Sequence, residues 1–425
     1  MTGVSGNNRN TPPHWDIALL GLWWSCNYGA VLTSFSLHCV LSRQGYRVLL
    51  LDHAPMTMAS HVNDPGSVFR TFFREEGIES IPISSRRDAE RTNRLADTFI
   101  AGSDQLWNYK YTHNQDMQYY LDFVDGEKRK IAYATSLGDL PVQPPQDYLD
   151  RIPRYLDCFH AISVREGDSV RTLRERYHIS ATHLVDPVFL TSMEDWNRLT
   201  QKASPMPDGM LTYFLDITES YGQACAAISR ELALPSAHLL DPSGDMELKK
   251  QYFPEGRVHA AATIYEWVRA FQDCKCVITD SFHGTCFAII FNKPFLCIKN
   301  AQRGATRFTS LLKQFGLEDR LIHSHEELSG KIHLLRFMDE DAVSLKKRSL
   351  KQRALGWLQT NLSNPVSEET KAKEKGIRCR QELSCWTPSW KLRLRRRISK
   401  LARCCLNEKL QKKIFPIMGK LIPRS

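Results

Sequence analysis

The feature that most constrains the fold of this sequence is a strand, a helix and a second strand that follow one another near its start. Residues 16–24 (DIALLGLWW) are apolar, residues 31–45 have the spacing of an amphipathic helix, and residues 46–53 (YRVLLLDH) are apolar again. Gly45 stands where such a helix would end. Two strands joined by a helix in this way run parallel in one sheet. We therefore expect a parallel sheet covered by helices.

The alternation of strands and helices continues over a length that exceeds one domain. The chain has 425 residues, whereas a domain has roughly 100–200. The predicted class is α/β, with a Rossmann-like domain over residues 14–190 and a second over 208–330. Residues 191–209, which contain two prolines, are interpreted as a linker. C-terminal helices are expected over 331–370, and a basic helical tail over 371–425.

The positive charge of the chain lies at its C-terminal end. The whole chain has a net charge of +10. From Lys371 onward there are 17 Lys and Arg against 3 Asp and Glu, a net of +14, which leaves residues 1–370 at −4. The two domains therefore lack the basic surface typical of nucleic-acid binding, and no nucleic-acid partner is expected.

Within the tail, apolar residues recur at helical spacing and basic residues stand between them. The apolar positions are Trp386, Trp390, Leu394, Ile398, Leu401 and Cys405. A basic amphipathic helix with tryptophans suits an anionic membrane surface. A solvated extension or a helix that docks on a partner protein explains the pattern equally well. Residues 386–425 are thus a candidate for peripheral membrane attachment.

The remaining composition favours a cytoplasmic protein, attached at most to the inner face of the cell membrane. The N-terminus lacks the apolar core of a secretory signal, and the longest apolar runs are too short to span a bilayer. The twelve cysteines are scattered singly, which favours reduced thiols. Cys274 and Cys276 are expected to point to one face of a strand, as buried thiols and not as zinc ligands.

Four small polar turns follow predicted strands, and ligands of doubly wound sheets bind beyond such strand ends. The first turn contains Asn27, Tyr28 and Gly29. Glycine permits close backbone approach, and the free amides at the start of the next helix suit a phosphate or carboxylate. A plain turn in which the Asn caps a helix accounts for the same residues.

The second and third turns add polar and charged groups. Ser103 and Asp104 lie beside a strand end, where they suit recognition of hydroxyl groups, although Asp104 can equally be a helix cap. Arg165 follows another strand and can hold a carboxylate or phosphate with two parallel hydrogen bonds. A salt bridge from Arg165 to Glu166 or a neighbour is the alternative.

The fourth turn contains Ser281, His283 and Gly284 between a strand and a helix. An imidazole at this place can act as a general acid or base near neutral pH, or donate to a leaving phosphate. A lone histidine is more often structural. The sequence has no Walker loop, HExxH or GxSxG motif, and no cluster of metal-ligand residues, so no metal or cofactor is expected.

In this order the segments resemble the polysaccharide pyruvyl transferase family. The resemblance covers about residues 16–320 and rests on GLWWSCNYGAVL, FIAGSDQLWN, IAYATSLGD, AISVRE, LVDPVFL, VITDSFHGTCFAIIFNKPF and RFTSLLKQFGLEDR. It implies a GT-B-like arrangement of two domains with a cleft between them. It also implies transfer of a pyruvyl group from phosphoenolpyruvate to a pair of hydroxyls on a cell-surface polysaccharide or its lipid-linked precursor.

The resemblance also suggests roles for the turn residues. His283 would be the acid/base or contact the phosphate, and Arg165 would hold the anionic groups of the donor. The first-domain turns would line the cleft, and Asp104 among them would be a further catalytic residue. Many family members carry an Arg two residues before the His, where this chain has Ser281. The cations that could replace it are Lys293, Arg303 and Arg307.

Two other functions are compatible with the sequence. A nucleotide-sugar glycosyltransferase could use the same fold and cleft. A non-catalytic scaffold could use the basic tail to bring other enzymes to a membrane. Phosphoenolpyruvate and a sugar or polysaccharide acceptor are nevertheless the partners that the resemblance favours.

Overall fold

A computed structural model describes most of the first of two compact units of the chain, which spans residues 1–367. The described ranges are 14–23, 27–53, 67–112, 117–138, 144–206, 208–300, 303–304 and 306–365. The basic tail over 371–425, including the predicted membrane-binding residues 386–425, lies outside them.

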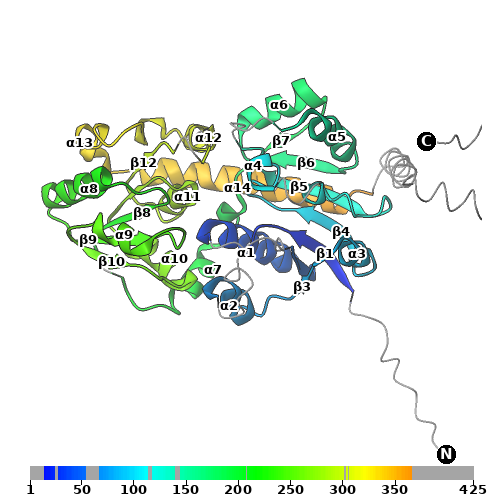
Figure 1. Ribbon diagram of the computed structural model, residues 1–425, viewed down its shortest axis with the longest axis horizontal. Coiled ribbons are helices and arrows are strands. Elements are labelled where there is room, and N and C mark those ends of the chain that lie inside the picture. The colour runs from blue at the N-terminus through cyan, green and yellow to red at the C-terminus, as the bar shows by residue number, and fades with distance from the viewer. Residues whose placement is uncertain are drawn as a thin grey trace, which may run out of the picture. The chain divides into compact units, whose positions relative to one another are not determined.

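The first domain contains a parallel sheet of seven strands in the order β3-β2-β1-β4-β5-β6-β7 (Figure 1). Its strands are β1 (Trp15–Leu20), β2 (Val48–Asp52), β3 (Ser80–Pro82), β4 (Ala96–Ala101), β5 (Arg129–Thr135), β6 (Ala161–Val164) and β7 (Thr182–His183). Its helices are α1 (Tyr28–Arg43), α2 (Val68–Glu75), α3 (Arg86–Arg91), α4 (Tyr109–Thr112), α5 (Gln146–Leu156) and α6 (Gly167–Tyr177). Single 3₁₀ turns lie at Thr92–Arg94, Gln118–Tyr120 and Pro187–Phe189.

Helix α1 begins earlier than its apolar pattern predicts because Asn27 caps it. The Asn27 side chain accepts a hydrogen bond from the backbone N–H of Ala30 at 3.1 Å. Beyond its end, Gly45 adopts a φ of +92°, a left-handed conformation that glycine reaches without strain. The short edge strand β3 was not predicted, because its segment is polar and carries no clear alternation.

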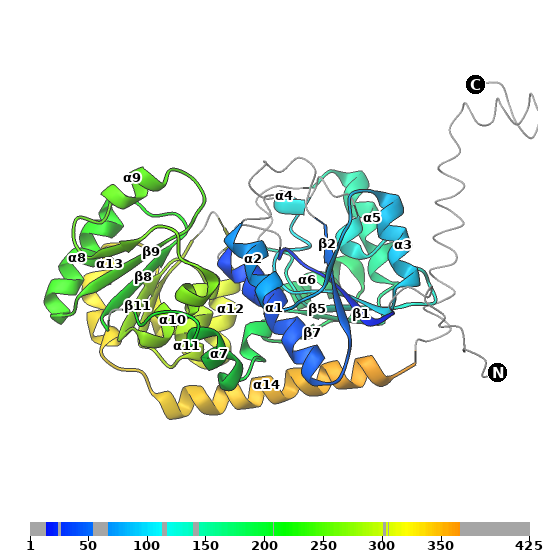
Figure 2. The ribbon, with the colours of Figure 1, turned by 90° about the horizontal axis from the view of Figure 1, so that it is seen from below.

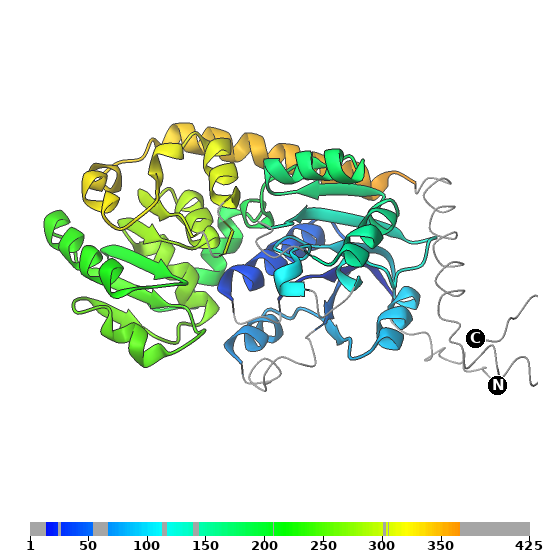
Figure 3. The same ribbon diagram turned by 45° about the horizontal axis from the view of Figure 1, so that its top comes forward.

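The second domain, drawn in green to yellow in Figure 3, repeats the architecture. Its six parallel strands have the order β10-β9-β8-β11-β12-β13. Its strands are β8 (Met210–Phe214), β9 (Ser236–Leu240), β10 (Arg257–His259), β11 (Cys276–Thr279), β12 (Phe295–Ile298) and β13 (Leu321–Ile322). Its helices are α8 (Glu219–Leu232), α9 (Met246–Gln251), α10 (Ile264–Asp273), α11 (Phe282–Ile290), α12 (Thr306–Phe315) and α13 (Glu327–Gly330), with 3₁₀ turns at Glu318–Arg320 and Ile332–Leu335. In each sheet the strand order reverses beside the first strand, which creates the crevice where such folds bind ligands.

Two helices connect the domains, α7 (Met193–Thr200) and the long α14 (Glu340–Ser363). Helix α14 runs along both domains (Figure 2). Lys347 near its start donates to Ile290 O at 2.9 Å in the second domain. Trp357 near its end packs against Tyr133 of the first domain, with ring centroids 6.1 Å apart. The helix therefore makes contacts that tie the two domains together.

Aromatic side chains fill the boundary between the domains. Tyr28 of α1 stacks on Trp267 of α10, with centroids 5.6 Å apart and planes 11° from parallel. Trp196 of α7 meets Phe287 of α11 edge to face at 5.0 Å. All four side chains are buried and belong to one hydrophobic core that draws on both sheets. Such packing favours a defined relation between the two domains.

The expectation that Cys274 and Cys276 share one face of a strand is wrong. Cys274 follows α10, and β11 begins only at Cys276. Cys274 packs in the core that contains Val277, whereas Cys276 packs in the core that contains Ile278. Burial raises the pKa of Cys276 to about 12, which keeps its thiol protonated and unreactive.

Two features are absent from the described residues. No helix in these ranges is long and apolar enough to cross a bilayer. The same residues contain no group of three or more His, Cys, Asp or Glu arranged to hold a metal ion.

Candidate active site

The strand ends of the two domains meet around a pocket of about 190 Å³. The first domain lines it with Leu22, Asn27, Ala30, Asp104, Gln105 and Tyr111, and the second with Leu215, Ser281, Phe282, His283, Arg303 and Arg307. Asn27, Asp104, Ser281, His283 and Arg307 were predicted as site residues from the sequence. The structure thus brings residues from three of the four predicted turns into one place.

His283 lies in the first turn of α11 and reaches across to the first domain. Its Nε2 lies 2.9 Å from Thr33 Oγ1 and 3.6 Å from Asp186 Oδ2. A Cβ atom built on Gly29 would lie 2.0 Å from His283 Nδ1. Glycine at position 29 is therefore required for the imidazole to lie against the start of α1. The predicted close approach exists, and the approaching group is this histidine.

Asp186 is the buried carboxylate next to the imidazole of His283. Its Oδ2 accepts hydrogen bonds from Ser103 Oγ and Arg165 Nη1, both at 2.8 Å. Its Oδ1 accepts one from Thr33 Oγ1 at 3.2 Å. Burial alone would raise the pKa of Asp186, but the hydrogen bonds and charges of His283 and Arg165 outweigh it and hold the pKa below its ordinary value. Asp186 is thus ionised, and its charge lies beside the imidazole of His283.

Arg165 is buried among three carboxylates. Its Nη2 donates to Asp104 at 3.0 Å, its Nη1 to Asp186 at 2.8 Å and its Nε to Glu166 at 3.2 Å. Its guanidinium also lies over the ring of Phe282, 4.5 Å from the centroid. This is the salt-bridge alternative recognised in the sequence. Arg165 holds the site carboxylates in place, and its direct contact with a donor stays a prediction.

Arg307 offers the pocket a charge that forms no ion pair with the described carboxylates. Its side chain is buried, and its Nε donates to Gly304 O at 3.1 Å. Among the described residues no carboxylate oxygen lies within 4.0 Å of it. Burial and the charge of Arg165 lower the pKa of Arg307 below its ordinary value. Most of its five N–H donors therefore remain available to an anion.

Arg303 stands beside Arg307 and is fixed by an acidic residue. Its Nε and Nη2 donate to the two carboxylate oxygens of Asp216 at 2.7 and 2.9 Å. Asn300 Nδ2 donates to Asp216 at 2.7 Å and to Asp280 at 3.0 Å. These hydrogen bonds orient Arg303 at the edge of the pocket.

Ser281 has a local structural role in addition to lining the pocket. Its Oγ accepts a hydrogen bond from the N–H of Gly284 at 3.2 Å and so caps α11. A Cβ on Gly284 would lie 2.4 Å from Thr279 Oγ1, so this glycine allows the helix to start close to β11. The cations at positions 303 and 307 lie in the same pocket as the serine.

Two further predicted residues lie outside the pocket lining. Tyr28 is buried, and its hydroxyl donates to Ala262 O at 2.6 Å across the domain boundary. Ser103 is buried, and its single O–H lies within hydrogen-bond distance of both Ala134 O, at 2.9 Å, and Asp186 Oδ2, at 2.8 Å. Both side chains therefore contact other residues of the protein and do not line the pocket. Their predicted direct contact with substrate stays untested.

Sequence reasoning did not single out Thr33, Tyr111 or Asp186 as site residues. Asp186 had a signal, because it ends the segment LVD and precedes a proline in a motif of the family resemblance. Thr33 had no such signal in the sequence, since it lies within a helix, one turn beyond the predicted loop residues.

Comparisons with known proteins agree with this fold. A family model of polysaccharide pyruvyl transferases matches residues 27–302, more than half of the chain. A search of curated protein sequences found no match. Among solved structures, UDP-GlcNAc 2-epimerase from Neisseria meningitidis bound to UDP-GlcNAc is similar, with 10% identity, a TM-score of 0.54 and coverage of 82% of this chain and 99% of that one. Anabaena HepE in complex with UDP and glucose has 13% identity, a TM-score of 0.49 and coverage of 82% and 100%.

The structural likeness concerns the fold, since identities this low do not carry function. The predicted fold class is confirmed: two Rossmann-like domains stand in a GT-B-like arrangement, and the pocket lies between them. The family model adds the activity. Because it spans most of both domains, this chain belongs to the polysaccharide pyruvyl transferase family and is an enzyme of that type.

Proposed function

We propose that the enzyme transfers the pyruvyl group of phosphoenolpyruvate to a pair of hydroxyls on a sugar of a cell-surface polysaccharide or its lipid-linked precursor. The observation that carries this proposal is the pocket itself. It combines an imidazole, His283, with two guanidinium groups, Arg303 and Arg307, and opposes them with polar residues of the other domain.

The two arginines suit the donor. Phosphoenolpyruvate carries a carboxylate and a phosphate, and both are recognised well by guanidinium groups. In many family members an Arg stands two residues before the His. Here Arg307 provides a charge free of carboxylate partners in the described part of the chain, and Arg303 lies beside it. We assign the donor's anionic groups to this pair.

The size of the pocket also favours a small donor. Pockets for drug-sized ligands have roughly 300–1,000 Å³, and this one has about 190 Å³. A phosphorylated three-carbon acid suits that volume better than a nucleotide sugar, which is several times larger.

In the reaction, His283 moves protons between acceptor and donor. A proton is added to the methylene carbon of phosphoenolpyruvate, and a sugar hydroxyl oxygen bonds to C2 and loses its proton. The bond from C2 to the phosphate oxygen then breaks, the second hydroxyl bonds to C2, and its proton leaves with the phosphate. Asp186, with its Oδ2 at 3.6 Å from His283 Nε2, positions the imidazole for this proton transfer. The arginines offset the negative charge on the departing phosphate.

The first-domain wall suits a sugar acceptor. Asn27, Asp104 and Gln105 offer polar side chains, and Tyr111 offers an aromatic ring that is 42% exposed. Hydroxyl groups of a sugar pair with such amide and carboxylate groups, and the apolar face of a sugar packs on aromatic rings. A lipid-linked acceptor would place the enzyme at the inner face of the cell membrane, where the basic sequence 386–425 supports peripheral attachment.

The proposal is tested by ligand titration of purified protein. A ligand that binds the native state stabilises it by RT ln(1 + [L]/Kd), about 2.7 kcal/mol at a hundred times Kd. We expect phosphoenolpyruvate to raise the melting temperature and UDP-sugars to have no effect. Stabilisation by a UDP-sugar alone would favour the glycosyltransferase alternative.

A matched set of variants locates the donor. Removing one hydrogen bond to a charged group costs about 1.5–3 kcal/mol, or about 10- to 100-fold in Kd. Arg307→Met and Arg303→Met should weaken phosphoenolpyruvate binding by this amount. Lys293→Met removes the same charge outside the pocket lining and should leave Kd unchanged. Equal effects of all three would count against the assigned donor site.

A further inference from the structure

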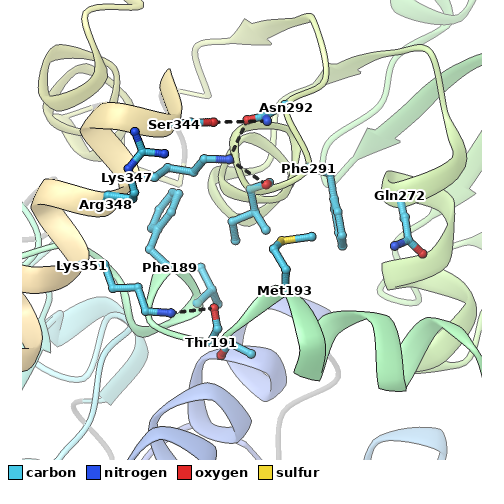
Figure 4. A pocket seen from close by; sticks show the side chains of 12 residues that line it. Phe189, Thr191, Met193, Gln272, Phe291, Asn292, Ser344, Lys347, Arg348 and Lys351 are labelled. Atoms are coloured by element: carbon cyan, nitrogen blue, oxygen red, sulfur yellow. Dashed lines mark hydrogen bonds between the residues drawn. The ribbon is translucent and has the colours of Figure 1, made fainter. Parts of the chain in front are cut away.

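A second pocket, separate from the candidate active site, lies where α7, α11 and α14 meet (Figure 4). Its volume is about 390 Å³, within the range of roughly 300–1,000 Å³ found for small-molecule sites. Its walls come from the end of the first domain and the start of α7 (Val188, Phe189, Thr191 and Met193), from the second domain (Gln272, Ile290, Phe291 and Asn292) and from α14 (Ser344, Lys347, Arg348 and Lys351).

Helix α14 presents three cations to this pocket, Lys347, Arg348 and Lys351. Like charges at i and i+4, as in the two lysines, repel each other on a helix. The described residues include no carboxylate oxygen within 4.0 Å of any of the three, and the pocket lining contains no acidic side chain. The pocket therefore holds an excess of positive charge that nothing in the described chain neutralises by direct contact.

The cations differ in how far their donors are engaged. Lys347 Nζ donates to Ile289 O, Ile290 O and Asn292 Oδ1 at 3.1, 2.9 and 2.6 Å, so it caps the end of α11. Burial lowers its pKa to about 8, with a smaller contribution from Arg348. Lys351 Nζ donates to Thr191 O at 3.3 Å.

Two of the three cations, Lys351 and Arg348, therefore have N–H donors left to bind a ligand. The ammonium of Lys351 has three N–H donors and uses one in the contact above. Arg348 makes no hydrogen bond or ion pair with the described residues and is exposed. Charge from these two side chains is available to a bound anion.

The rest of the lining is largely apolar. In Figure 4 the side chains of Phe189, Phe291 and Met193 surround the space beside the lysines. Met193 is 46% exposed, an unusual exposure for a large apolar side chain. An inorganic anion would leave these groups in contact with water, whereas a ligand with an apolar portion would cover them.

We propose that this pocket binds a small amphipathic anion, a phosphate or carboxylate head that carries an apolar group. The head pairs with Arg348 and Lys351, and the apolar portion packs between the side chains of Phe189, Met193 and Phe291. Such a ligand contacts both domains and α14 at once, so its binding stabilises the connection between them. The proposal is independent of the donor and acceptor assigned to the active site.

Calorimetric titration with phenyl phosphate tests it, with inorganic phosphate and phenol as the two partial ligands. Phenyl phosphate should bind at least tenfold more tightly than either, because inorganic phosphate lacks the apolar group and phenol lacks the anionic head. Binding should persist in Arg307→Met, which removes the free guanidinium of the active-site pocket. Loss of binding in that variant would place the ligand in the active site and overturn the proposal.

Variants of α14 provide the matched comparison. Arg348→Ala and Lys351→Met should each weaken phenyl phosphate binding by about tenfold or more, the effect of a lost hydrogen bond to a charged group. Lys346→Ala removes a charge from an exposed position of the same helix outside the pocket lining and should leave the affinity unchanged. Equal affinities in all three variants, or tighter binding of inorganic phosphate than of phenyl phosphate, would overturn the proposal.

Discussion

His283 of the second domain and Asp186 of the first form a pair across the domain boundary, with 3.6 Å between Nε2 and Oδ2. The pair requires both domains to be in place, since Asp186 follows β7 and His283 lies in the first turn of α11. It resembles the arrangement in which a buried carboxylate orients an imidazole for proton transfer.

We predict that His283→Ala lowers kcat by about 10²- to 10⁴-fold, the usual contribution of general acid–base catalysis. The measurement is phosphate release from phosphoenolpyruvate in the presence of acceptor. Circular dichroism and the melting temperature serve as the control for folding. Unchanged turnover in a folded variant would remove His283 from the catalytic role.

Asp186→Asn should act through the histidine and lower kcat while phosphoenolpyruvate still binds. The amide removes the charge that lies 3.6 Å from His283 Nε2, so the imidazole loses a group that positions it. We expect kcat to fall and Kd for phosphoenolpyruvate to stay at the wild-type value. A purely structural role for Asp186 predicts a lower melting temperature with an unchanged kcat in the folded variant. Measuring kcat, Kd and the melting temperature together therefore separates the two roles.

Gly29→Ala should impair catalysis without preventing folding of the rest of the chain. The added Cβ would lie 2.0 Å from His283 Nδ1, so the imidazole must move. We expect a loss of kcat comparable to that of His283→Ala. Gly356→Ala is the matched control, because nothing lies within 4 Å of its added Cβ in α14. It should raise stability by about 0.5–1 kcal/mol and leave kcat unchanged.

Tyr28→Phe separates a structural role from the predicted contact with substrate. The variant keeps the stacking on Trp267 and removes the hydrogen bond to Ala262 O. A lost buried hydrogen bond should lower the free energy of unfolding by about 1–3 kcal/mol. If the residue acts only in packing, KM for both substrates stays at the wild-type value. A raised KM at unchanged stability would support the substrate contact.

Asp280 should make stability depend on pH in a specific direction. Burial raises its pKa from the ordinary 3.8 to about 6 in the native state, although the N–H groups of Leu215 and Asp216 oppose the shift. Between these values the native state binds more protons than the unfolded state. The contribution of Asp280 to the free energy of unfolding therefore falls as pH rises from about 4 to 6.

Denaturant unfolding at a series of pH values measures this effect. Asp280→Asn removes the titrating group, so the slope of the unfolding free energy between pH 4 and 6 should become more positive than in the wild type. The variant is also less stable at every pH, because an amide cannot accept both backbone hydrogen bonds on two oxygens. Equal slopes in the two proteins would contradict the raised pKa.

Much of the local structure could be predicted from sequence because it depends on neighbouring residues. The apolar runs of β1 and β2 and the helical spacing of α1 between them indicate a parallel unit. Asn27 and Ser281 precede helices, where polar caps are favoured. The short strand β3 was missed because an edge strand of three residues leaves little periodic signal.

The sequence by itself thus determined the two parallel α/β domains and the turns at their strand ends, since both follow from periodicity and from residues that favour caps or turns. Only the tertiary structure decided which partners each side chain contacts and therefore which role it has. Thr33 and His283 are 250 residues apart and share a hydrogen bond, and Arg165 faces carboxylates instead of the pocket. A buried charge is stable only where opposite charges and donors surround it, and those partners come from distant segments that the fold alone brings together.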